Sequence, residues 1–375
     1  MKNLAAAVAI ALLHIMPASA ENLRVASWNI ANLASQPEQA LRGHARSAEV
    51  YAHINSVISS LDADIIALQE IGSIPGAERA VGPDYDVYFE TRCMENDQRC
   101  RFDNDDIYTA IAVRKSIKDK VTIQQLDKLS ILHDDECCTP PRHVRGSPVA
   151  VVEFGDQKIW IPSIHLKSAC KEGTTNNDDL KDDCAVNATQ FNILEHWIAD
   201  RPKGDAVILA GDFNRLLFKA PNLVARLGAK AQLLPEMHKR ACWEGYLFDF
   251  AALKQQALIN NPNAYQGGLQ PRIYTPTEFG AIDFFVVSGL RDSVAADADQ
   301  IEMDAFYSFG DPGSVLTKCD GSSNPFGTQL LTFGRADPSD HCPIVMSIKE
   351  SLPVSLLVER TSYSEFCVIE ITIGQ

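Results

Sequence analysis

Two parts of the chain repeat one plan, in which a strand and a helix lead to a second strand that ends in a carboxylate. In the first part, residues 23–30 (LRVASWNI) alternate in polarity as a half-buried strand does, and apolar residues then recur at helical spacing over residues 50–61. The segment Asp62-Ala63-Asp64 ends this helix. Residues 65–70 (IIALQE) form an apolar run typical of a buried strand, and the run ends in a glutamate.

The second part follows the same order. Residues 158–168 (KIWIPSIHLKS) predict a strand that carries a histidine, and residues 187–198 predict a helix with Asn187 as its N-cap. Residues 206–214 (AVILAGDFN) predict a buried strand that ends in an aspartate and an asparagine. Two similar α/β halves predict two sheets packed face to face with helices outside them, and ligands in such layouts bind where strands end.

The rest of the chain adds strands to this plan. Residues 219–265 are typical of helical and irregular structure, and their clearest helical pattern lies over residues 247–259. The chain has 375 residues, of which 46% are hydrophobic, and it contains no Ser/Gly/Pro linker or low-complexity run, so one large domain is favoured. Further strands are expected at residues 107–115, 147–154, 281–288 and 342–348.

The N-terminus has the three parts of a secretory signal. Lys2 supplies a positive charge, residues 4–13 (LAAAVAIALL) are apolar but too short to span a bilayer, and residues 17–20 (PASA) end in an A-x-A cleavage pattern. We therefore expect residues 1–20 to be a signal peptide and the mature protein to be secreted or periplasmic. A short membrane anchor is the alternative.

The cysteines agree with export. There are ten, and none forms the C-x-x-C pair typical of a zinc site, so in an oxidising compartment they predict disulfides. Cys93 and Cys100 bracket one polar segment, and Cys170 and Cys184 bracket another, which predicts a disulfide at the neck of each loop. The sequence leaves open the pairing of the remaining six, which are Cys137, Cys138, Cys242, Cys319, Cys342 and Cys367.

Polar residues stand beside the apolar runs. Residues two apart on a strand point the same way, so Asp212 and Asn214 should share a face with Phe213 turned away from them. The glycine before Asp212 would let a substrate or another backbone approach closely. The full set is Asn29, Glu70, His165, Asp212, Asn214, Asp283, Asp340 and His341.

This set of side chains suits one kind of chemistry. Oxygen ligands suit a hard cation such as Mg²⁺ together with substrate phosphate oxygens, and histidines near carboxylates suit proton transfer near neutral pH. The set therefore predicts metal-assisted hydrolysis of a phosphoester. Taken singly, some members could serve the fold alone, since Glu70 could cap a turn and His165 could be a hydrogen-bonded core histidine. Asp283 lies within an apolar strand and needs a partner in any case.

Six motifs in this order resemble the endonuclease/exonuclease/phosphatase superfamily, whose fold is that of deoxyribonuclease I. They are SWNI, ALQE, HLKS, GDFN, IDFFVVS and SDHCPI, and they extend from about residue 23 to residue 348. The resemblance implies an α/β fold with four layers, in which two packed mixed β-sheets are flanked by helices. It implies a catalytic domain over residues 21–350, followed by an extension over residues 351–375 to which we assign no function.

The resemblance also implies a metal and a phosphate site. Glu70 matches the main Mg²⁺ ligand, with Asn29 beside it, and Asp340 matches a position often near the metal. Mn²⁺ and Ca²⁺ are the alternative ions. Arg145 resembles an arginine that contacts the substrate phosphate, and Arg142 is the alternative because the spacing in HVRGSP is irregular.

The catalytic roles come from the same comparison. Asp212 matches the residue that orients or deprotonates the attacking water, and Asn214 matches a neighbour that positions the phosphate. His341 matches a histidine that contacts the scissile phosphate or acts as base, with Asp283 as its carboxylate partner. His165 is the candidate acid for the leaving group.

The expected activity is that of a secreted Mg²⁺-dependent phosphodiester hydrolase, with nucleic acid as the favoured substrate. The net charge of −15 argues against binding through a broadly basic surface, although a metal can supply local positive charge. A phospholipid or sphingomyelin phosphodiesterase and a phosphomonoesterase are alternatives, but residues 271–280 and 304–315 form no convincing membrane wedge. A binding or toxin-like module without catalysis is the alternative of another class.

Overall fold

The computed structural model describes residues 22–42, 44–95, 106–133, 142–170, 172, 182–234, 282–291, 294–300, 341 and 343–350. The expected signal peptide, the C-terminal extension, the expected helix at residues 247–259, Cys100, Asp340 and the six cysteines of open pairing lie outside these residues. Among the described residues, no helix is long and apolar enough to cross a membrane.

The first sheet contains both strands of the first repeat. Its six strands lie in the order β15-β16-β1-β4-β6-β5, with β1 parallel to β4 and the other pairs antiparallel. The strands are β1 (Asn22–Leu33), β4 (Ile65–Ile71), β5 (Tyr85–Phe89), β6 (Tyr108–Arg114), β15 (Val294–Gln300) and β16 (Ile344–Glu350).

The second sheet contains both strands of the second repeat. Its six strands lie in the order β13-β14-β12-β11-β10-β7, with β11 parallel to β12 and the other pairs antiparallel. The strands are β7 (Val121–Gln125), β10 (Pro148–Phe154), β11 (Gln157–His165), β12 (Ala206–Asp212), β13 (Gln232–Leu234) and β14 (Asp283–Ser288).

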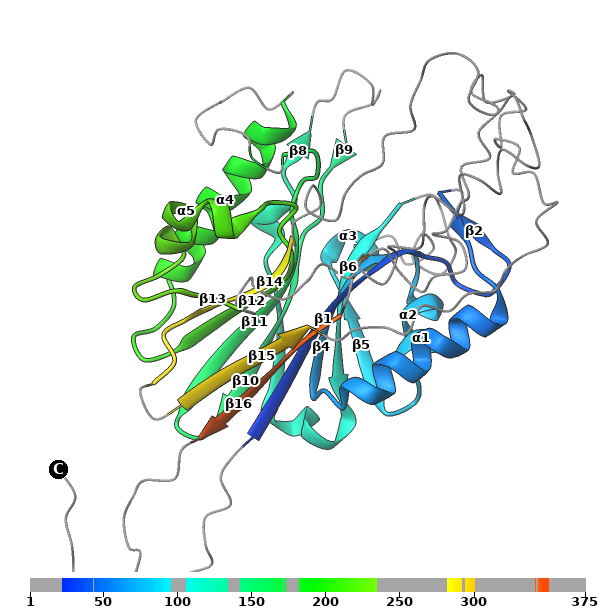
Figure 1. Ribbon diagram of the computed structural model, residues 1–375, viewed down its shortest axis with the longest axis horizontal. Coiled ribbons are helices and arrows are strands. Elements are labelled where there is room, and N and C mark those ends of the chain that lie inside the picture. The colour runs from blue at the N-terminus through cyan, green and yellow to red at the C-terminus, as the bar shows by residue number, and fades with distance from the viewer. Residues whose placement is uncertain are drawn as a thin grey trace, which may run out of the picture.

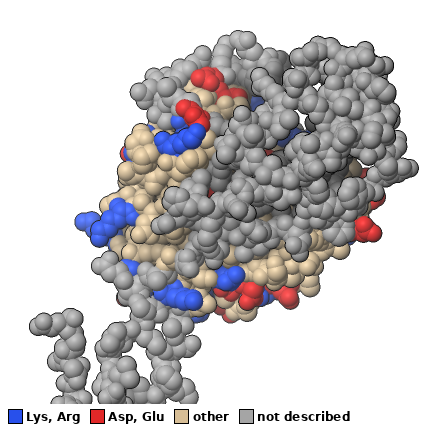
Figure 2. Space-filling model, viewed as in Figure 1, with Lys and Arg blue, Asp and Glu red and all other residues tan. Residues whose placement is uncertain are grey.

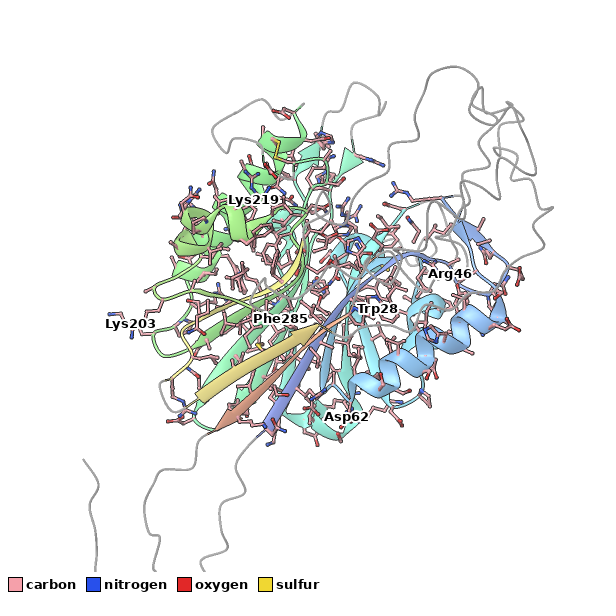
Figure 3. The ribbon with its side chains drawn as sticks, viewed as in Figure 1. Trp28, Arg46, Asp62, Lys203, Lys219 and Phe285 are labelled. Atoms are coloured by element: carbon pink, nitrogen blue, oxygen red, sulfur yellow. A yellow bond between two sulfur atoms is a disulfide. The ribbon has the colours of Figure 1, made fainter. Side chains whose placement is uncertain are left out.

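Four layers stack in the order helices, sheet, sheet, helices (Figure 1). Helices α1 (Ala48–Leu61) and α2 (Ile74–Val81) pack on the outer face of the first sheet, and α4 (Asp183–Ala199) and α5 (Pro221–Arg226) pack on the outer face of the second. A third apolar core fills the space between the sheets, where Phe285 lies (Figure 3). The predicted sandwich of two mixed sheets flanked by helices is therefore confirmed.

The remaining elements are short. Strands β2 and β3 form one two-stranded sheet, and β8 and β9 form another. The structure also has one short helix and three 3₁₀ helices among the described residues. These elements are β2 (Ala40–Leu41), β3 (His44–Ala45), β8 (Leu132–His133), β9 (Arg142–His143), α3 (Thr91–Glu95), η1 (Lys115–Lys120), η2 (Asp127–Leu129) and η3 (Leu217–Lys219).

Helix α1 shows why the first repeat folds as predicted. The Ser47 side chain accepts a hydrogen bond from the amide of Val50, which satisfies one of the free N–H groups at the helix start. The helix ends where Asp62 takes a left-handed conformation, with φ of 45°. The apolar face of the helix is buried on the sheet and includes Val50, Tyr51, Ile54, Val57, Ile58 and Leu61.

The second repeat differs from its prediction at the helix start. Helix α4 begins at Asp183, with Asp182 as the N-cap, so the assignment of Asn187 as N-cap is wrong. The earlier start arises because the Asp182 carboxylate already accepts the amide of Cys184. Asn187 is instead buried, and its amide group donates to the carbonyl oxygens of Lys167 and Phe213. It thereby ties the helix to the segments that follow β11 and β12.

One predicted loop closure is confirmed. Cys170 and Cys184 form a disulfide that joins the segment after β11 to the first turn of α4. Cys93 is also disulfide-bonded, but Cys100 lies outside the described residues, so the predicted pairing of these two cysteines stays a prediction.

Candidate active site

Residues from strand ends in both sheets line one pocket. Six predicted site residues reach it, and Asn29 and Asp283 lie directly behind them through hydrogen bonds. Asp340 lies outside the described residues. The six are Glu70, Arg145, His165, Asp212, Asn214 and His341.

Sheet register brings three of the predicted residues together. His165 is paired with Asp212 between β11 and β12, and Asp212 is paired with Asp283 between β12 and β14. Directly paired residues point to the same face of a sheet, so these three side chains form a row across the strand ends. The row explains why β11 and β12 end, and β14 begins, with a polar residue.

Gly211 permits this arrangement. A Cβ at Gly211 would lie 2.0 Å from the carbonyl oxygen of Ile164 on the neighbouring strand, and the residue has φ of 149°. The sequence left open whether the glycine before Asp212 admits a substrate or another backbone. The structure shows that it admits the backbone of β11.

Glu70 reaches the pocket through an irregularity in β4. The register of β4 shifts between Leu68 and Ile71, and Glu70 itself has φ of 59°, in the left-handed region. A buried polar contact supports the strand here: the Gln69 amide group donates to the hydroxyl of Ser163 on the other sheet at 3.1 Å. Left-handed non-glycine residues are strained and are concentrated at functional sites.

Asn214 reaches the pocket by a route that differs from the expected one. Strand β12 ends at Asp212, and Asn214 takes a left-handed conformation with φ of 52°, so strand alternation does not place it. Its amide N–H donates to Asp212 Oδ1 at 2.7 Å, and its side-chain nitrogen donates to the carbonyl of Leu166 at 3.0 Å. Phe213 points into the apolar core, as expected.

His341 is held from two sides. Its Nδ1–H donates to the Asp283 carboxylate at 2.6 Å, which leaves Nε2 4.0 Å from Asp212 Oδ2. The indole N–H of Trp28 donates to the His341 backbone carbonyl at 2.9 Å. The ring is thus fixed by the carboxylate and the backbone by the tryptophan of the SWNI motif.

Asn29 joins the two halves of the site. Its side-chain nitrogen donates to Glu70 Oε1 at 3.3 Å and to Asp212 Oδ2 at 3.1 Å. Its side-chain oxygen, the atom expected to bind Mg²⁺, already accepts the backbone N–H of Ala31 at 2.9 Å. In this geometry Asn29 orients two carboxylates.

The electrostatic environment shifts the pKa values of two residues in opposite directions. Burial, together with the nearby Asp283 carboxylate, raises the pKa of Asp212 to about 7. Burial, followed by the charges of Arg145 and His341, lowers the pKa of His165 well below its usual 6.5. At pH 7 the imidazole of His165 is therefore neutral, and Asp212 is near the midpoint of its titration.

The pocket contains the donor groups of a cation site. Asp212, Asp283 and His341 present ligand atoms that all lie within 4.8 Å of one another. The Glu70 and Asp212 carboxylates also converge, because both face His165 Nε2, at 3.8 and 3.7 Å. The Glu70 and Asp212 carboxylates, close to the neutral imidazole of His165, supply oxygen ligands that suit a hard divalent cation. The residues present therefore fit the expected metal.

Arg145 adds positive charge beside the carboxylates. One guanidinium nitrogen donates to the Leu166 carbonyl at 2.9 Å, while Nε is buried without a hydrogen-bond partner among the described residues. Burial lowers the pKa of Arg145 from its usual value. A half-buried guanidinium at the wall of a pocket is suited to bind a phosphate oxygen.

Several pocket residues were not identified from the sequence. Lys167 lies two residues after His165 in the HLKS motif and forms an ion pair with Asp183 at 2.5 Å. Trp28 of the SWNI motif does not line the pocket but is buried and donates to the His341 backbone, so both motifs contained a usable signal. Arg42 and Arg92 also line the pocket, but they stand in segments with no motif that would have singled them out.

The comparisons with known proteins agree with this geometry. The model of the Endonuclease/Exonuclease/phosphatase family matches residues 26–341. No curated protein sequence matches the chain.

Some solved structures are also similar to the chain, at low sequence identity. An endonuclease/exonuclease/phosphatase from Bacteroides vulgatus is 13% identical over 88% of this chain and 99% of its own, with a TM-score of 0.48. A family protein from Bacteroides thetaiotaomicron is 16% identical over 89% of this chain and 100% of its own, with a TM-score of 0.47. TDP2 of D. rerio, solved with a single-strand DNA product, is 16% identical over 87% of this chain and 98% of its own, with a TM-score of 0.44.

The two packed mixed sheets, the polar pocket at their strand ends and the family match over residues 26–341 lead to one conclusion. The chain belongs to the endonuclease/exonuclease/phosphatase family.

Proposed function

We propose that the protein is an exported phosphodiester hydrolase that uses a divalent cation, Mg²⁺ in the first instance, and acts on nucleic acid. The observation that carries this proposal is the convergence of Glu70, Asp212, the His341–Asp283 pair and Arg145 on one pocket. This combination provides carboxylates for a cation, an oriented histidine and a guanidinium for phosphate, which are the groups that phosphoester hydrolysis requires.

Glu70 and Asp212 are the residues that would hold the cation, with Asp340 as a further expected ligand. When bound, a divalent cation neutralises charge on the phosphate oxygens and increases the electrophilicity of phosphorus. We assign Asn29 to positioning, because its amide nitrogen donates to the Glu70 and Asp212 carboxylates at 3.3 and 3.1 Å.

The remaining residues handle the water and the phosphate. Asp212 takes a proton from the attacking water as the new P–O bond forms and the bond to the leaving oxygen breaks. Burial raises the pKa of Asp212 above that of an ordinary aspartate and so offsets the decrease that a bound cation would cause. Asp283 holds the His341 ring through Nδ1, which leaves Nε2 to contact the scissile phosphate, and Asn214, which also lines the pocket, positions that phosphate.

His165 has a different task from the expected one. Its lowered pKa makes a protonated imidazole unfavourable at neutral pH, so it is a poor general acid. We assign it to donating a hydrogen bond from neutral Nε2–H to the leaving oxygen during the reaction, because Nε2 faces the Glu70 and Asp212 carboxylates at 3.8 and 3.7 Å, beyond hydrogen-bond distance. Solvent then supplies the proton that completes the leaving alcohol.

The nucleic-acid assignment rests on charge near the pocket. Arg42, Arg92, Arg142, Arg145 and Lys167 all line it, although the chain as a whole carries a net charge of −15. On the face shown in Figure 2, basic and acidic residues of the described surface are interspersed. Affinity for a polyanion would therefore come from the pocket and its bound cation.

Two further observations bear on the substrate and the compartment. Among the described residues, the large apolar side chains that are exposed are Leu132 and Phe218, and residues 271–280 and 304–315 lie outside those residues. The Cys170–Cys184 disulfide supports export to an oxidising compartment.

One assay panel tests the proposal. The purified mature protein would be given plasmid DNA, RNA, sphingomyelin, a phosphomonoester and bis-p-nitrophenyl phosphate, each with Mg²⁺ and then with EDTA. We expect EDTA-sensitive hydrolysis that is fastest on a nucleic acid. If sphingomyelin or the phosphomonoester is hydrolysed fastest, that class of compound replaces nucleic acid as the proposed substrate. If none of the compounds is hydrolysed, the proposal that the protein is an enzyme is rejected.

Variants link the activity to this pocket. His341→Ala and Glu70→Gln should each lower kcat/KM by about 10³-fold or more, because each removes a group that acts on the transition state. His196→Ala is the control, since His196 lies on the surface of α4 and contacts the Asn192 carbonyl. Near-normal rates in the Glu70 or His341 variant, with the fold intact by circular dichroism, would show that the site lies elsewhere.

A further inference from the structure

A second buried carboxylate, Glu90, lies behind the pocket without lining it. Glu90 follows β5, is fully buried, and its two oxygens accept four hydrogen bonds. Arg92 supplies two of them in a fork, at 2.9 and 2.7 Å. The backbone amides of Thr109 and Gly146 supply the other two, at 3.2 and 2.5 Å.

These contacts fix the segment that carries Arg145. Glu90 accepts the Gly146 N–H, and the Thr109 hydroxyl donates to the Gly146 carbonyl at 3.0 Å. Two residues before Arg145, the His143 carbonyl accepts a hydrogen bond from Arg92 at 3.3 Å. The backbone on both sides of Arg145 is therefore attached to one buried ion pair, while the Arg145 guanidinium reaches the pocket and the Leu166 carbonyl.

The packing around Gly146 is equally specific. A Cβ at this position would lie 3.1 Å from Glu90 Oε2, closer than the carboxylate tolerates without moving. A buried ion pair contributes little net stability, because removing both charges from water costs about as much as their attraction returns. A better account of this pair is that it holds a particular conformation.

We propose that Glu90 is a positioning residue that presets the Arg145 guanidinium for the substrate phosphate. This inference rests on the proposed function, because it takes Arg145 as the phosphate-binding group. A residue that is fixed before the substrate arrives loses less conformational entropy on binding, so Glu90 contributes to phosphate affinity without touching phosphate.

The test is a double-mutant cycle between Glu90→Gln and Arg145→Ala. Glutamine keeps the shape of Glu90, but its NH₂ group cannot accept the hydrogen bonds from Arg92 or Gly146. We expect Glu90→Gln alone to lower kcat/KM on bis-p-nitrophenyl phosphate by about 10- to 100-fold, as loss of an outer partner does. In the Arg145→Ala background, the same change should cost less than about threefold, because two groups that act as one unit are not additive.

A matched control separates positioning from stability. Asp64→Asn makes the same carboxylate-to-amide change at a half-buried site that accepts the Arg24 backbone N–H at 2.9 Å. Asp64 directly precedes β4, whereas the pocket lies at the other end of that strand, so this variant should change the unfolding midpoint but not kcat/KM. Thr109→Val removes only the hydroxyl contact to Gly146, and it replaces Glu90→Gln if that variant does not fold.

The outcomes are distinct. Unchanged kcat/KM in Glu90→Gln, or a loss that adds fully to that of Arg145→Ala, would overturn the positioning role. Calorimetric titration with inorganic phosphate gives a second measurement, in which Glu90→Gln should weaken binding by about 10-fold or more and Asp64→Asn should not. If the wild-type protein hydrolyses no phosphoester, the proposed function fails, while the phosphate titration still decides whether Glu90 presets Arg145.

Discussion

Asp212 is buried beside the other ionisable groups of the site. It is 1% exposed, and burial together with the Asp283 carboxylate raises its pKa from 3.8 to about 7. Between these two pH values the folded protein holds a proton that the unfolded chain releases, so the contribution of Asp212 to stability decreases as pH rises towards 7. His165 acts in the other direction, because its lowered pKa reduces stability as pH falls below 6.5.

The carboxyl pKa of Asp212 is directly measurable. In metal-free protein, we expect the ¹³C resonance of the Asp212 carboxyl to titrate with a midpoint near 7. Saturating Mg²⁺ should lower that midpoint by about one to three units, the usual effect of a neighbouring opposite charge. The Asp212→Asn variant identifies the resonance by its disappearance. A midpoint near 4 without metal would show that burial does not raise the pKa of Asp212, and a midpoint that Mg²⁺ does not change would contradict the assignment of Asp212 to the cation.

At the scale of elements, the geometry of the site depends on the backbone at the ends of β4, β11 and β12. Glu70 and Asn214 both adopt left-handed backbone conformations, and Gly211 lets β12 approach β11 closely enough for His165 and Asp212 to pair. Glu70 lies one residue before the end of β4, and Asn214 lies two residues after the end of β12. Strain at strand ends is therefore part of how this fold presents its polar residues.

Replacing Gly211 tests the close approach of β11 and β12. Gly211→Ala should destabilise the protein by about 3 kcal/mol in urea unfolding, because the new methyl group collides with the Ile164 carbonyl. Gly204→Ala is the control, since Gly204 also has a positive φ, of 96°, but its Cβ would meet nothing within 4 Å. Backbone strain is common to both variants, so equal losses would show that the collision with Ile164 is unimportant.

At the scale of the whole molecule, the core between the sheets holds the two halves of the site in one pocket. The first sheet supplies Glu70 and Asn29, and the second supplies His165, Asp212 and Asp283. Phe285 is fully buried between the sheets, on the strand that begins with Asp283. Packing of the inner faces therefore sets the distances between catalytic groups that belong to different sheets.

A pair of phenylalanine variants tests the role of this core. Phe285→Ala should cost about 3–5 kcal/mol of unfolding free energy, as expected for a large buried side chain. Phe218→Ala makes the same change at a side chain that is 37% exposed, and it should cost within about 0.5 kcal/mol. Chemical denaturation followed by tryptophan fluorescence measures both. Similar losses in the two variants would mean that the sheets are not held by this core.

Much of the fold could be predicted from the sequence, because alternation and apolar runs report local burial. The strands at residues 65–70 and 206–212 and helix α1 follow from such patterns, and the repeat indicated two packed sheets. Strands β5, β7, β13 and β15 were not predicted. All four lie at sheet edges, and the partial exposure of β5, β7 and β13 weakens the apolar pattern of those strands.

The sequence by itself determined which residues could do chemistry, because polar groups at the ends of apolar runs stand out locally. Only the tertiary structure decided how they are arranged. The left-handed turns at Glu70 and Asn214, the orientation of Asn29 between two carboxylates and the Glu90 contacts behind Arg145 all arise from segments distant in the sequence. Contacts between such segments do not change the hydrophobic periodicity of either segment. They can therefore be identified only in the folded structure, where the two sheets pack together.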